Sequence, residues 1–319
     1  MNLAAATCPT LYFIGVSTRQ SSIMKVFPDW AAHLGLRNVA IAGIDFPLHA
    51  PPADYRAVVR FIKDDPLSLG ALVTTHKIDL YAACADLFDV VDAHARRLAE
   101  TSCLSKSGGQ FVCHAKDPVT AGLALDHFIP AGHFARTGAE VFAIGAGGST
   151  LALTWHLMQA SRGADRPARV LVTDRCARRL HDIERLHRSW ATGIRCEYML
   201  AQTAADNDAV LQGLRPAALV VNASGMGKDR PGSPLTDACP FPEAALVWEL
   251  NYRGELSFLQ QARRQAQERR LQVEDGWLYF IYGWSRVLAE VFHIEVPVSG
   301  PGFRQLCRIA QQAGQPAPP

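Results

Sequence analysis

The sequence predicts an α/β protein of two domains with a cleft between them. Apolar runs of strand length alternate with segments of helical spacing along most of the chain, a pattern typical of a mostly parallel sheet covered by helices. One run, Val141–Ile144, is followed at once by a cluster of glycines and then by a helical segment. The 319 residues are enough for about two domains with substantial cores.

Composition indicates an ordinary soluble globular protein, with 49% hydrophobic and 19% charged residues. The formal net charge of +2 gives no electrostatic argument for a nucleic acid or an acidic membrane surface as a partner. No apolar run approaches the ~18 residues that span a bilayer. Because Met1–Pro9 lacks a positively charged segment followed by an apolar core, no signal peptide is expected.

Cysteine and histidine usage adds two expectations. The eight cysteines are scattered without a Cys-x-x-Cys pair, which favours free thiols in a reducing cytoplasm over a disulfide framework. The eleven histidines show no metal-ligand spacing, so no metal site is expected. We therefore expect a cytoplasmic protein of enzyme size, and the sequence leaves open whether it forms a homodimer.

The first third of the chain alternates strands and helices. A hairpin signal, Ser107-Gly108-Gly109, separates the strand-like segments Thr101–Ser105 and Gln110–His114. Asp117–His127 is predicted to be a helix with Asp117 as its N-cap and Pro118 at its first position. The remaining strands are expected at Leu11–Val16, Asn38–Phe46 and Leu69–Thr74, and the remaining helices at Ile23–Leu34 and Ala53–Ile62, while Ile78–Leu98 is expected to be largely helical.

The alternation resumes after Pro130–Gly138, which has little periodicity and is the expected connection between the domains. Gly276–Phe292 is rich in aromatic residues and predicts a half-buried helix, and the Gln315–Pro319 tail is expected to be disordered. Residues 1–122, completed by helices within 277–319, should form one domain, and residues 123–276 the other. The second domain should contain strands Val141–Ile144, Arg169–Thr173, Ile194–Met199, Ala218–Asn222 and Leu246–Leu250, and helices Thr150–Gln159, Ala177–Trp190 and Glu255–Arg270.

The turn after Val141–Ile144 has the order strand, glycines, helix that a dinucleotide-binding motif needs. Gly145 permits a tight turn, and Gly147 lets the backbone approach a pyrophosphate. Gly148 leaves the helix N-terminus open, where free N–H groups and the helix dipole favour an anion. A flexible surface loop is the alternative, but the flanking strand and helix favour a Rossmann-type domain whose loop is Gly145, Ala146, Gly147, Gly148 and Ser149.

Five short stretches follow one another along the chain: Gln20-Ser21-Ser22, Leu72–Lys77, Lys116-Asp117, Gly145–Gly148 and Val221–Gly227. In this order they resemble the motifs of the shikimate and quinate dehydrogenase family. The order and spacing are more specific than any single match, and they span nearly the whole chain. The resemblance implies an NAD(P)-dependent dehydrogenase acting on a CH–OH group, with residues 1–122 as the substrate-binding and catalytic domain and residues 123–276 as the NAD(P)-binding domain.

Lys77 and Asp117 are the catalytic pair that the resemblance implies. Oxidation of an alcohol needs a group that removes the hydroxyl proton while hydride leaves the carbon. A lysine can do this when burial or neighbours lower its pKa toward neutrality. Asp117 would orient the lysine and share a hydrogen bond with the hydroxyl. For either residue alone, a surface lysine at a strand end or an ordinary helix cap is the simpler interpretation.

The departures from the family pattern point to a different substrate. A site built around a substrate hydroxyl discriminates strongly by hydrogen bonding, so replacing its polar side chains should change the substrate. The family's asparagine, threonine and proline before the lysine fall on Ala71, Val73 and Thr75. We therefore expect a small cyclic, carboxylated or polyhydroxylated compound other than shikimate, bound by Ser21, Ser22, Thr74, Ser102, Tyr252 and Tyr282.

The choice of cofactor depends on the residues after the second strand of the nucleotide domain. An acidic residue there accepts hydrogen bonds from a ribose 2′-hydroxyl and repels a 2′-phosphate, so Asp174 argues for NAD. Arg175 and Arg179 fall where NADP-using members of the family hold the phosphate, which guanidinium groups suit. NAD or NADP therefore remains undecided. The nicotinamide pocket is expected at Asn222, Gly225 and Met226.

A second hypothesis belongs to another class of protein. The same fold could serve a catalytically silent protein that binds a nucleotide or a metabolite. A turnover screen over a panel of cyclic alcohols distinguishes this hypothesis from the enzyme. The sequence determines neither the substrate nor the direction of the reaction.

Overall fold

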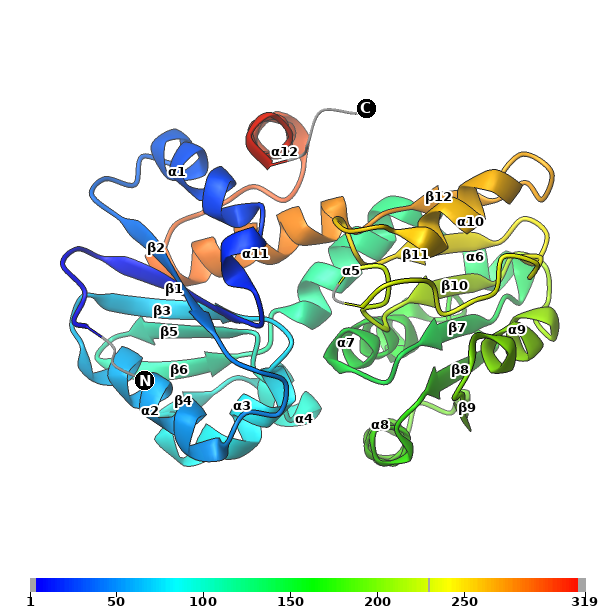
Figure 1. The fold of residues 1–319 in the computed structure, drawn as a ribbon, viewed down its shortest axis with the longest axis horizontal. Helices are drawn as coiled ribbons and strands as arrows, with labels where there is room; N and C mark the ends of the chain where they lie inside the picture. The colour runs from blue at the N-terminus through cyan, green and yellow to red at the C-terminus, as the bar shows by residue number, and fades with distance from the viewer. Residues whose placement is uncertain (1–3, 229, 315–319) are drawn as a thin grey trace. The chain divides into compact units, whose positions relative to one another are not determined.

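The computed structural model describes residues 4–228 and 230–314. They form two compact units, each built around its own six-stranded sheet (Figure 1). Unit 1 comprises the chain up to Thr120 and from Ile281 onward, and unit 2 comprises Ala121–Phe280. The predicted α/β class is confirmed. The tail Gln315–Pro319 lies outside the described residues. Among those residues, no helix has both the length and the apolar character needed to cross a bilayer.

The sheet of unit 1 is mixed. Its order is β2-β1-β3-β5-β6-β4. The strands β1, β2 and β3 run parallel, β5 is antiparallel to both β3 and β6, and β4 is parallel to β6. The predicted hairpin is therefore confirmed as β5–β6, and β6 runs in the same direction as β3. The strands are β1 (Thr10–Gly15), β2 (Ala40–Asp45), β3 (Ser68–Val73), β4 (Val90–Val91), β5 (Cys103–Ser107) and β6 (Gln110–His114).

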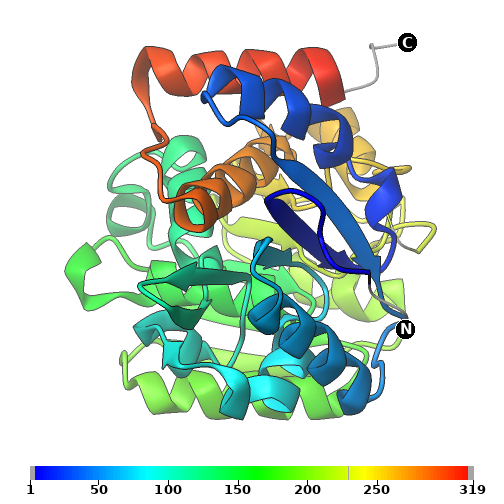
Figure 2. The same cartoon turned by 90° about the vertical axis from the view of Figure 1, so that its left-hand side faces the viewer.

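The C-terminal helix completes unit 1 by packing against its first helix. Figure 2 shows α12 lying along α1. The Trp30 indole N–H of α1 donates to the carbonyl of Leu306, 3.0 Å away, and the Ser22 hydroxyl donates to the carbonyl of Gly314 at 2.9 Å. Trp30 is fully buried. The helices of this unit are α1 (Ile23–His33), α2 (Pro52–Asp64), α3 (Lys77–Cys84), α4 (Ala93–Leu98), the ends of α5 (Asp117–Phe128) and α11 (Trp277–Phe292), and α12 (Gly300–Gly314).

The segment Ile78–Leu98, predicted to be largely helical, is helical over most of its length but is interrupted by a strand. The segment contains α3, a 3-10 turn at Ala85–Leu87, the short strand β4 and α4. Val90 and Val91 pair with Val112 and Cys113 of β6, so pairing with a distant strand overrides the local helical pattern. The Asp92 side chain then accepts the N–H of Ala95 at 2.6 Å and caps α4.

The sheet of unit 2 is parallel throughout. Its order is β12-β11-β10-β7-β8-β9, which is the strand order of a Rossmann domain. The central strand β7 is buried at every residue, as expected of a strand covered on both faces. The strands are β7 (Val141–Ile144), β8 (Arg169–Asp174), β9 (Arg195–Leu200), β10 (Leu219–Asn222), β11 (Leu246–Glu249) and β12 (Gln272–Glu274).

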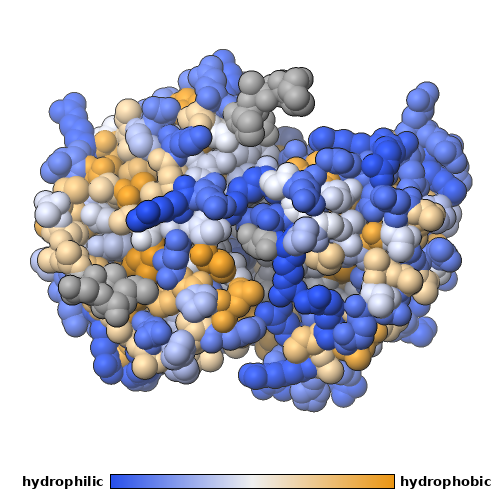
Figure 3. All heavy atoms as spheres, in the orientation of Figure 1, coloured by the Kyte–Doolittle hydropathy of each residue, from blue (hydrophilic) through white to orange (hydrophobic). Residues whose placement is uncertain are grey.

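The helices of unit 2 differ from the prediction in three places. Pro130–Gly138, expected to be an irregular connection, contains α6. The helix α9, which begins with a capping box between Thr203 and Asp206, was not predicted, and α10 is shorter than the predicted Glu255–Arg270. Hydrophilic residues gather over α10 (Figure 3). The helices are α6 (His133–Thr137), α7 (Gly148–Met158), α8 (Ala177–Trp190), α9 (Ala204–Gln212) and α10 (Ser257–Gln265), with the remaining parts of α5 and α11.

Candidate active site

Lys77 and Asp117 form an ion pair in unit 1. Lys77 begins α3 just after β3, and Asp117 begins α5 just after β6. Because β3 and β6 run in the same direction, their carboxyl ends lie at the same edge of the sheet, where open α/β sheets hold ligands. The two side chains are only 14% and 11% exposed. The structure thus brings together two residues that are forty positions apart in the sequence.

Ser102 holds the backbone at the start of α5. Its Oγ accepts the N–H of Lys116 at 2.7 Å and the N–H of Asp117 at 3.4 Å. Ser102 is 2% exposed, and its own N–H donates to the carbonyl of His114 at 2.9 Å. The residue predicted to contact the substrate therefore fixes the position of Asp117.

Ser102→Ala should destabilise the protein by about 1–2 kcal/mol, because one buried and one partly buried N–H group lose their acceptor. Denaturant-induced unfolding of the variant measures this loss. Ser107→Ala, at an exposed position of β5, is the matched control and should change stability by less than ~0.5 kcal/mol. Equal unfolding midpoints for the two variants would show that Ser102 does not anchor α5.

The pKa of Lys77 differs from the expectation. Burial is the largest single effect on the pKa of Lys77 and would lower it, but the charges of Asp117 and Glu100 and the hydrogen bond to Asp117 together outweigh burial, and the pKa is raised above its ordinary value. The condition under which a lysine acts as a base at neutral pH, a lowered pKa, is therefore not met in this structure. At neutral pH Lys77 is an ammonium group, which can give a proton to a developing alkoxide.

Glu100 is a third ionisable group in this region, and it was not among the predicted site residues. Its side chain is fully buried, and both carboxyl oxygens are without a hydrogen-bond partner in the described structure. Burial, together with the nearby charge of Asp117, raises the pKa of Glu100 to about 8, against the opposing effect of Lys77. No local pattern marks a buried glutamate, so the sequence carries no signal for it.

A second polar network of unit 1 surrounds His114. Its Nε2 lies 2.9 Å from the Ser105 hydroxyl and 3.3 Å from a Glu290 oxygen, and its Nδ1 lies 3.4 Å from Asp92. Lys116 pairs with Glu290 at 2.5 Å. Serine, histidine and aspartate in this order resemble a nucleophilic triad. Ser105 is fully buried, however, so its hydroxyl is closed to a substrate and the network is structural.

The glycine loop of unit 2 has the conformation that a pyrophosphate site needs. Gly145 has φ +111°, and a Cβ there would lie 2.6 Å from the carbonyl oxygen of Ala223, so only glycine fits this turn. A Cβ on Gly147, at the N-cap of α7, would meet no atom within 4 Å. Open space therefore lies at the N-terminus of α7, where unpaired N–H groups favour an anion.

The Asp174 carboxylate is tied to that loop. One oxygen accepts the N–H of Ala146 at 2.8 Å, and the other accepts the N–H of Cys176 at 2.8 Å. Arg175 and Arg179 are exposed, and neither guanidinium pairs with a carboxylate among the described residues. A carboxylate that suits the ribose hydroxyl of NAD and guanidinium groups that suit the 2′-phosphate of NADP therefore lie together at the end of β8. The geometry does not favour one of the two cofactors.

Asn222 and Met226 belong to a buried network at the carboxyl ends of β10 and β11. The Asn222 amide donates to Glu249 at 2.7 Å, and the amides of Asn222 and Asn251 both donate to the carbonyl of Met226, at 3.3 and 3.0 Å. Gly225 has φ +75° in the turn between them. Burial raises the pKa of Glu249 to about 7, although its amide partners oppose this shift. The sequence analysis missed Glu249.

The other residues predicted to bind substrate have varied surroundings. In unit 1, Ser22 donates its hydroxyl to Gly314 and Thr74 donates to the carbonyl of Ile14 at 3.3 Å, while Ser21 is 5% exposed. Tyr282 donates to the carbonyl of Val298 at 3.3 Å and stacks on Phe303. In unit 2, Tyr252 belongs to an aromatic cluster with Trp277 and Phe280.

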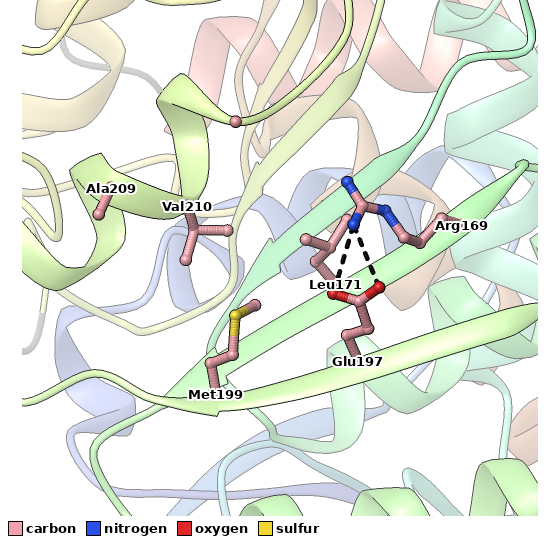
Figure 4. Close-up of a pocket in the computed structure, with 7 residues that line it drawn as sticks. Arg169, Leu171, Glu197, Met199, Ala209 and Val210 are labelled. Carbon is pink, nitrogen blue, oxygen red and sulfur yellow. Dashed lines mark hydrogen bonds and ion pairs between the residues drawn. The ribbon is translucent and has the colours of Figure 1, made fainter.

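A hollow of about 360 Å³ in unit 2 is lined by none of these residues. Arg169 and Leu171 of β8 and Glu197 and Met199 of β9 line it, and Ala209 and Val210 line it from α9 (Figure 4). The guanidinium of Arg169 is already paired with Glu197 at 3.1 Å and with Glu140 at 2.9 Å. The hollow therefore lies along the face of two strands, whereas nucleotides bind beyond the carboxyl ends of the strands.

No protein-family model matches the sequence, and no curated protein matches it. Solved structures do. Quinate dehydrogenase from Corynebacterium glutamicum in complex with NAD covers 96% of this chain and 99% of its own, with a TM-score of 0.72 and 18% identity. The chain has the fold of the shikimate and quinate dehydrogenases.

Two further structures with this fold are similar over similar lengths. Shikimate 5-dehydrogenase from Thermus thermophilus, in complex with NADP(H) and shikimate, covers 94% of this chain and 99% of its own, with a TM-score of 0.64 and 20% identity. The ligand-free 5-ketofructose reductase of a Gluconobacter species covers 96% and 98%, with a TM-score of 0.63 and 14% identity. At these identities the likeness is one of fold.

Proposed function

We propose that this chain is an NAD(P)-dependent oxidoreductase that interconverts a secondary alcohol and a ketone in a small cyclic, carboxylated or polyhydroxylated compound other than shikimate. The observation that carries the proposal is the ion pair between Lys77 and Asp117 at the carboxyl edge of the unit 1 sheet. A lysine in such a pair exchanges a proton with a substrate oxygen. The fold shared with dehydrogenases that contain NAD or NADP(H) supports the same conclusion.

The glycine loop supports a dinucleotide in unit 2. The open space at Gly147 and the N-terminus of α7 suit a pyrophosphate. The ribose of the adenosine would meet Asp174, Arg175 and Arg179 after β8. A bound nicotinamide would accept or supply the hydride. Asn222, Gly225 and Met226 follow β10 and would line its pocket.

Lys77 transfers the proton in both directions of the reaction, as donor in ketone reduction and as acceptor in alcohol oxidation. At neutral pH it carries the proton that a ketone oxygen needs as hydride arrives at the carbon. In the reverse direction the neutral amine takes the hydroxyl proton, and the raised pKa of Lys77 makes this form scarce at neutral pH. Asp117 holds the side chain in place in both. The proposed enzyme should therefore reduce ketones readily at neutral pH and oxidise alcohols better as the pH rises.

The substrate differs from shikimate because the polar side chains before Lys77 are replaced. Ala71, Val73 and Thr75 stand where the family pattern has asparagine, threonine and proline, and Ser102 uses its oxygen within the protein. Buried apolar side chains such as Ala71 and Val73 cannot bind a substrate hydroxyl. One structure with this fold is named a 5-ketofructose reductase, which supports substrates beyond shikimate.

Asp174→Asn should shift cofactor preference toward NADP. A unit charge ~4 Å from a 2′-phosphate is worth on the order of a few kcal/mol at an effective dielectric of ~20, and screening at this half-buried position leaves about a tenfold change in the ratio of Kd values. Titration of both cofactors into the variant measures the ratio. Asp182→Asn, which removes the same charge from α8, is the control. An unchanged ratio in Asp174→Asn would mean that the arginines alone determine preference.

A turnover screen tests the proposal. The protein is incubated with a panel of cyclic alcohols and ketones, carboxylated and polyhydroxylated, together with NAD, NADP or the reduced forms, and absorbance at the nicotinamide band is followed. Turnover that disappears in Lys77→Ala supports the proposal. Cofactor binding without turnover on any compound would instead favour a silent binding protein.

A further inference from the structure

Glu100 is a buried carboxyl group that directly precedes Thr101 and Ser102 in the sequence. These two residues make hydrogen bonds to the proposed catalytic pair. Ala99, the C-cap of α4, has φ +51°, a left-handed conformation that is uncommon for alanine. The N–H of Glu100 bonds back to the carbonyl of Ala95 at 3.3 Å. This turn ends α4 and starts the segment Glu100–Ser102, which is buried throughout.

That segment contacts both members of the pair through the backbone. The N–H of Thr101 donates to the carbonyl of Lys77 at 3.1 Å. The Ser102 hydroxyl accepts the N–H of Asp117. Glu100 therefore belongs to a segment that is hydrogen-bonded both to the start of α3 and to the start of α5. Its carboxyl group interacts electrostatically with Lys77 and with Asp117.

The charges around Glu100 are unbalanced. Lys77 from α3 is positive, whereas Asp117 from α5 and Asp92 at the start of α4 are negative, and the Cys113 thiol of β6 is also within electrostatic reach. Both oxygens of Glu100 lack a hydrogen-bond partner among the described residues and are closed to solvent. A carboxylate in such surroundings is costly, so Glu100 keeps its proton at neutral pH and releases it as its pKa of about 8 is passed.

We propose that Glu100 is a positioning residue whose charge state controls how tightly Lys77 holds its proton. While Glu100 is neutral, Lys77 responds to the Asp117 carboxylate alone. Once Glu100 ionises, a second negative charge stabilises the ammonium form, and the neutral amine becomes scarcer. Glu100 itself is closed to solvent. A role of Glu100 in catalysis rests on the proposed function, but the effect of Glu100 on the protonation of Lys77 is measurable without any substrate.

Competitive labelling with acetic anhydride tests the inference. The anhydride acylates only neutral amines, and mass spectrometry gives the rate at each lysine between about pH 7 and 10.5, a range that brackets the ordinary lysine pKa. Glu100→Gln should increase the labelling rate of Lys77 about tenfold above pH ~8, with Lys25, an exposed lysine of α1, as the internal standard. Glu140→Gln, which alters a buried glutamate of unit 2, should leave Lys77 unchanged.

Thermal unfolding provides the second measurement. A carboxyl group whose pKa is raised in the folded protein stabilises it fully below the ordinary value of 4.5 and loses that contribution as the pH rises to about 8. The Tm of Glu100→Gln minus that of the wild type should therefore grow from pH 4.5 to about 8 and then level off. Glu100→Met, which removes the buried polar atoms altogether, should give the same trend. It replaces Glu100→Gln in this measurement if the glutamine variant folds poorly.

Two results would overturn the inference. Equal labelling of Lys77 in the wild type and both variants would mean that Glu100 has no influence on the lysine. A Tm difference independent of pH would mean that Glu100 does not titrate in this range. Loss of turnover in Lys77→Ala concerns the proposed function separately, so the two ideas fail independently.

Discussion

Lys77→Ala is expected to lower kcat by ~10²–10⁴, the usual contribution of a positioned acid–base group. Lys77 and Asp117 are the first residues of two helices that follow strands of the same direction, so loss of the amine removes the proton donor without moving either helix. Cofactor affinity should stay nearly constant, because the glycine loop belongs to unit 2. Steady-state kinetics on the best compound from the turnover screen, with cofactor titrated separately, measures both quantities.

The controls separate chemistry from stability. Removing one member of a buried ion pair leaves the other charge uncompensated, so the unfolding midpoint of Lys77→Ala is measured beside its rate. Asp117→Asn should give a related but smaller defect, because the amide still hydrogen-bonds a substrate hydroxyl. Lys106→Ala removes a lysine that bonds to the Asp65 carbonyl elsewhere in unit 1 and should keep full turnover. Near wild-type turnover in Lys77→Ala would place the proton transfer at another group.

Gly147→Val should abolish cofactor binding in a protein that still folds. Gly147 has φ −100° and ψ −175°, an extended conformation that valine adopts readily, and its Cβ would enter open space. The branched side chain would fill the space that the pyrophosphate needs. Loss of two charge-assisted hydrogen bonds raises Kd by more than about a hundredfold. Isothermal titration with NAD and NADP, together with circular dichroism, measures binding and folding in the same sample.

Two neighbouring substitutions show that the effect is local. Gly147→Ala places a smaller group in the same space and should weaken binding less. Gly145→Ala should instead damage the fold, because its Cβ would lie 2.6 Å from the Ala223 carbonyl oxygen and its φ is +111°. If Gly147→Val folds and titrates like the wild type, the loop after β7 does not hold a nucleotide.

Most of the sheet strands were predictable because each is a short apolar run between turn residues. Val141–Ile144 agrees with β7 at both ends, and the other long strands agree within a few residues. The strand β4 was not predictable, because Val90 and Val91 lie in a segment of helical composition and pair only with the distant β6. The helix α9 had a readable start signal in Thr203 and Asp206, but its short polar sequence lacks a clear apolar face.

The candidate site was predictable in part. The strand–glycine–helix order identified the loop of unit 2, and the resemblance identified Lys77 and Asp117, which do meet. The surroundings of that pair were not predictable. The pKa of Lys77 is raised against the effect of burial by Asp117 and Glu100 together, and Glu100 belongs to a third segment that no local pattern distinguishes. For Ser102 the position was predicted but its role was not. Its hydroxyl accepts backbone N–H groups of Lys116 and Asp117, whereas the prediction had it bind the substrate.

The packing of α12 against α1 has a consequence for how the protein is made. Unit 2 is one continuous stretch, Ala121–Phe280, whereas unit 1 needs both ends of the chain. During synthesis from the N-terminus, unit 2 can fold as soon as it leaves the ribosome. The indole of Trp30 and the hydroxyl of Ser22 must wait for Leu306 and Gly314. The apolar surface of α1 therefore stays uncovered until α12 has been translated. A ribosome that stalls before α12 releases a chain whose unit 2 can already be folded and whose unit 1 is open to chaperones and proteases.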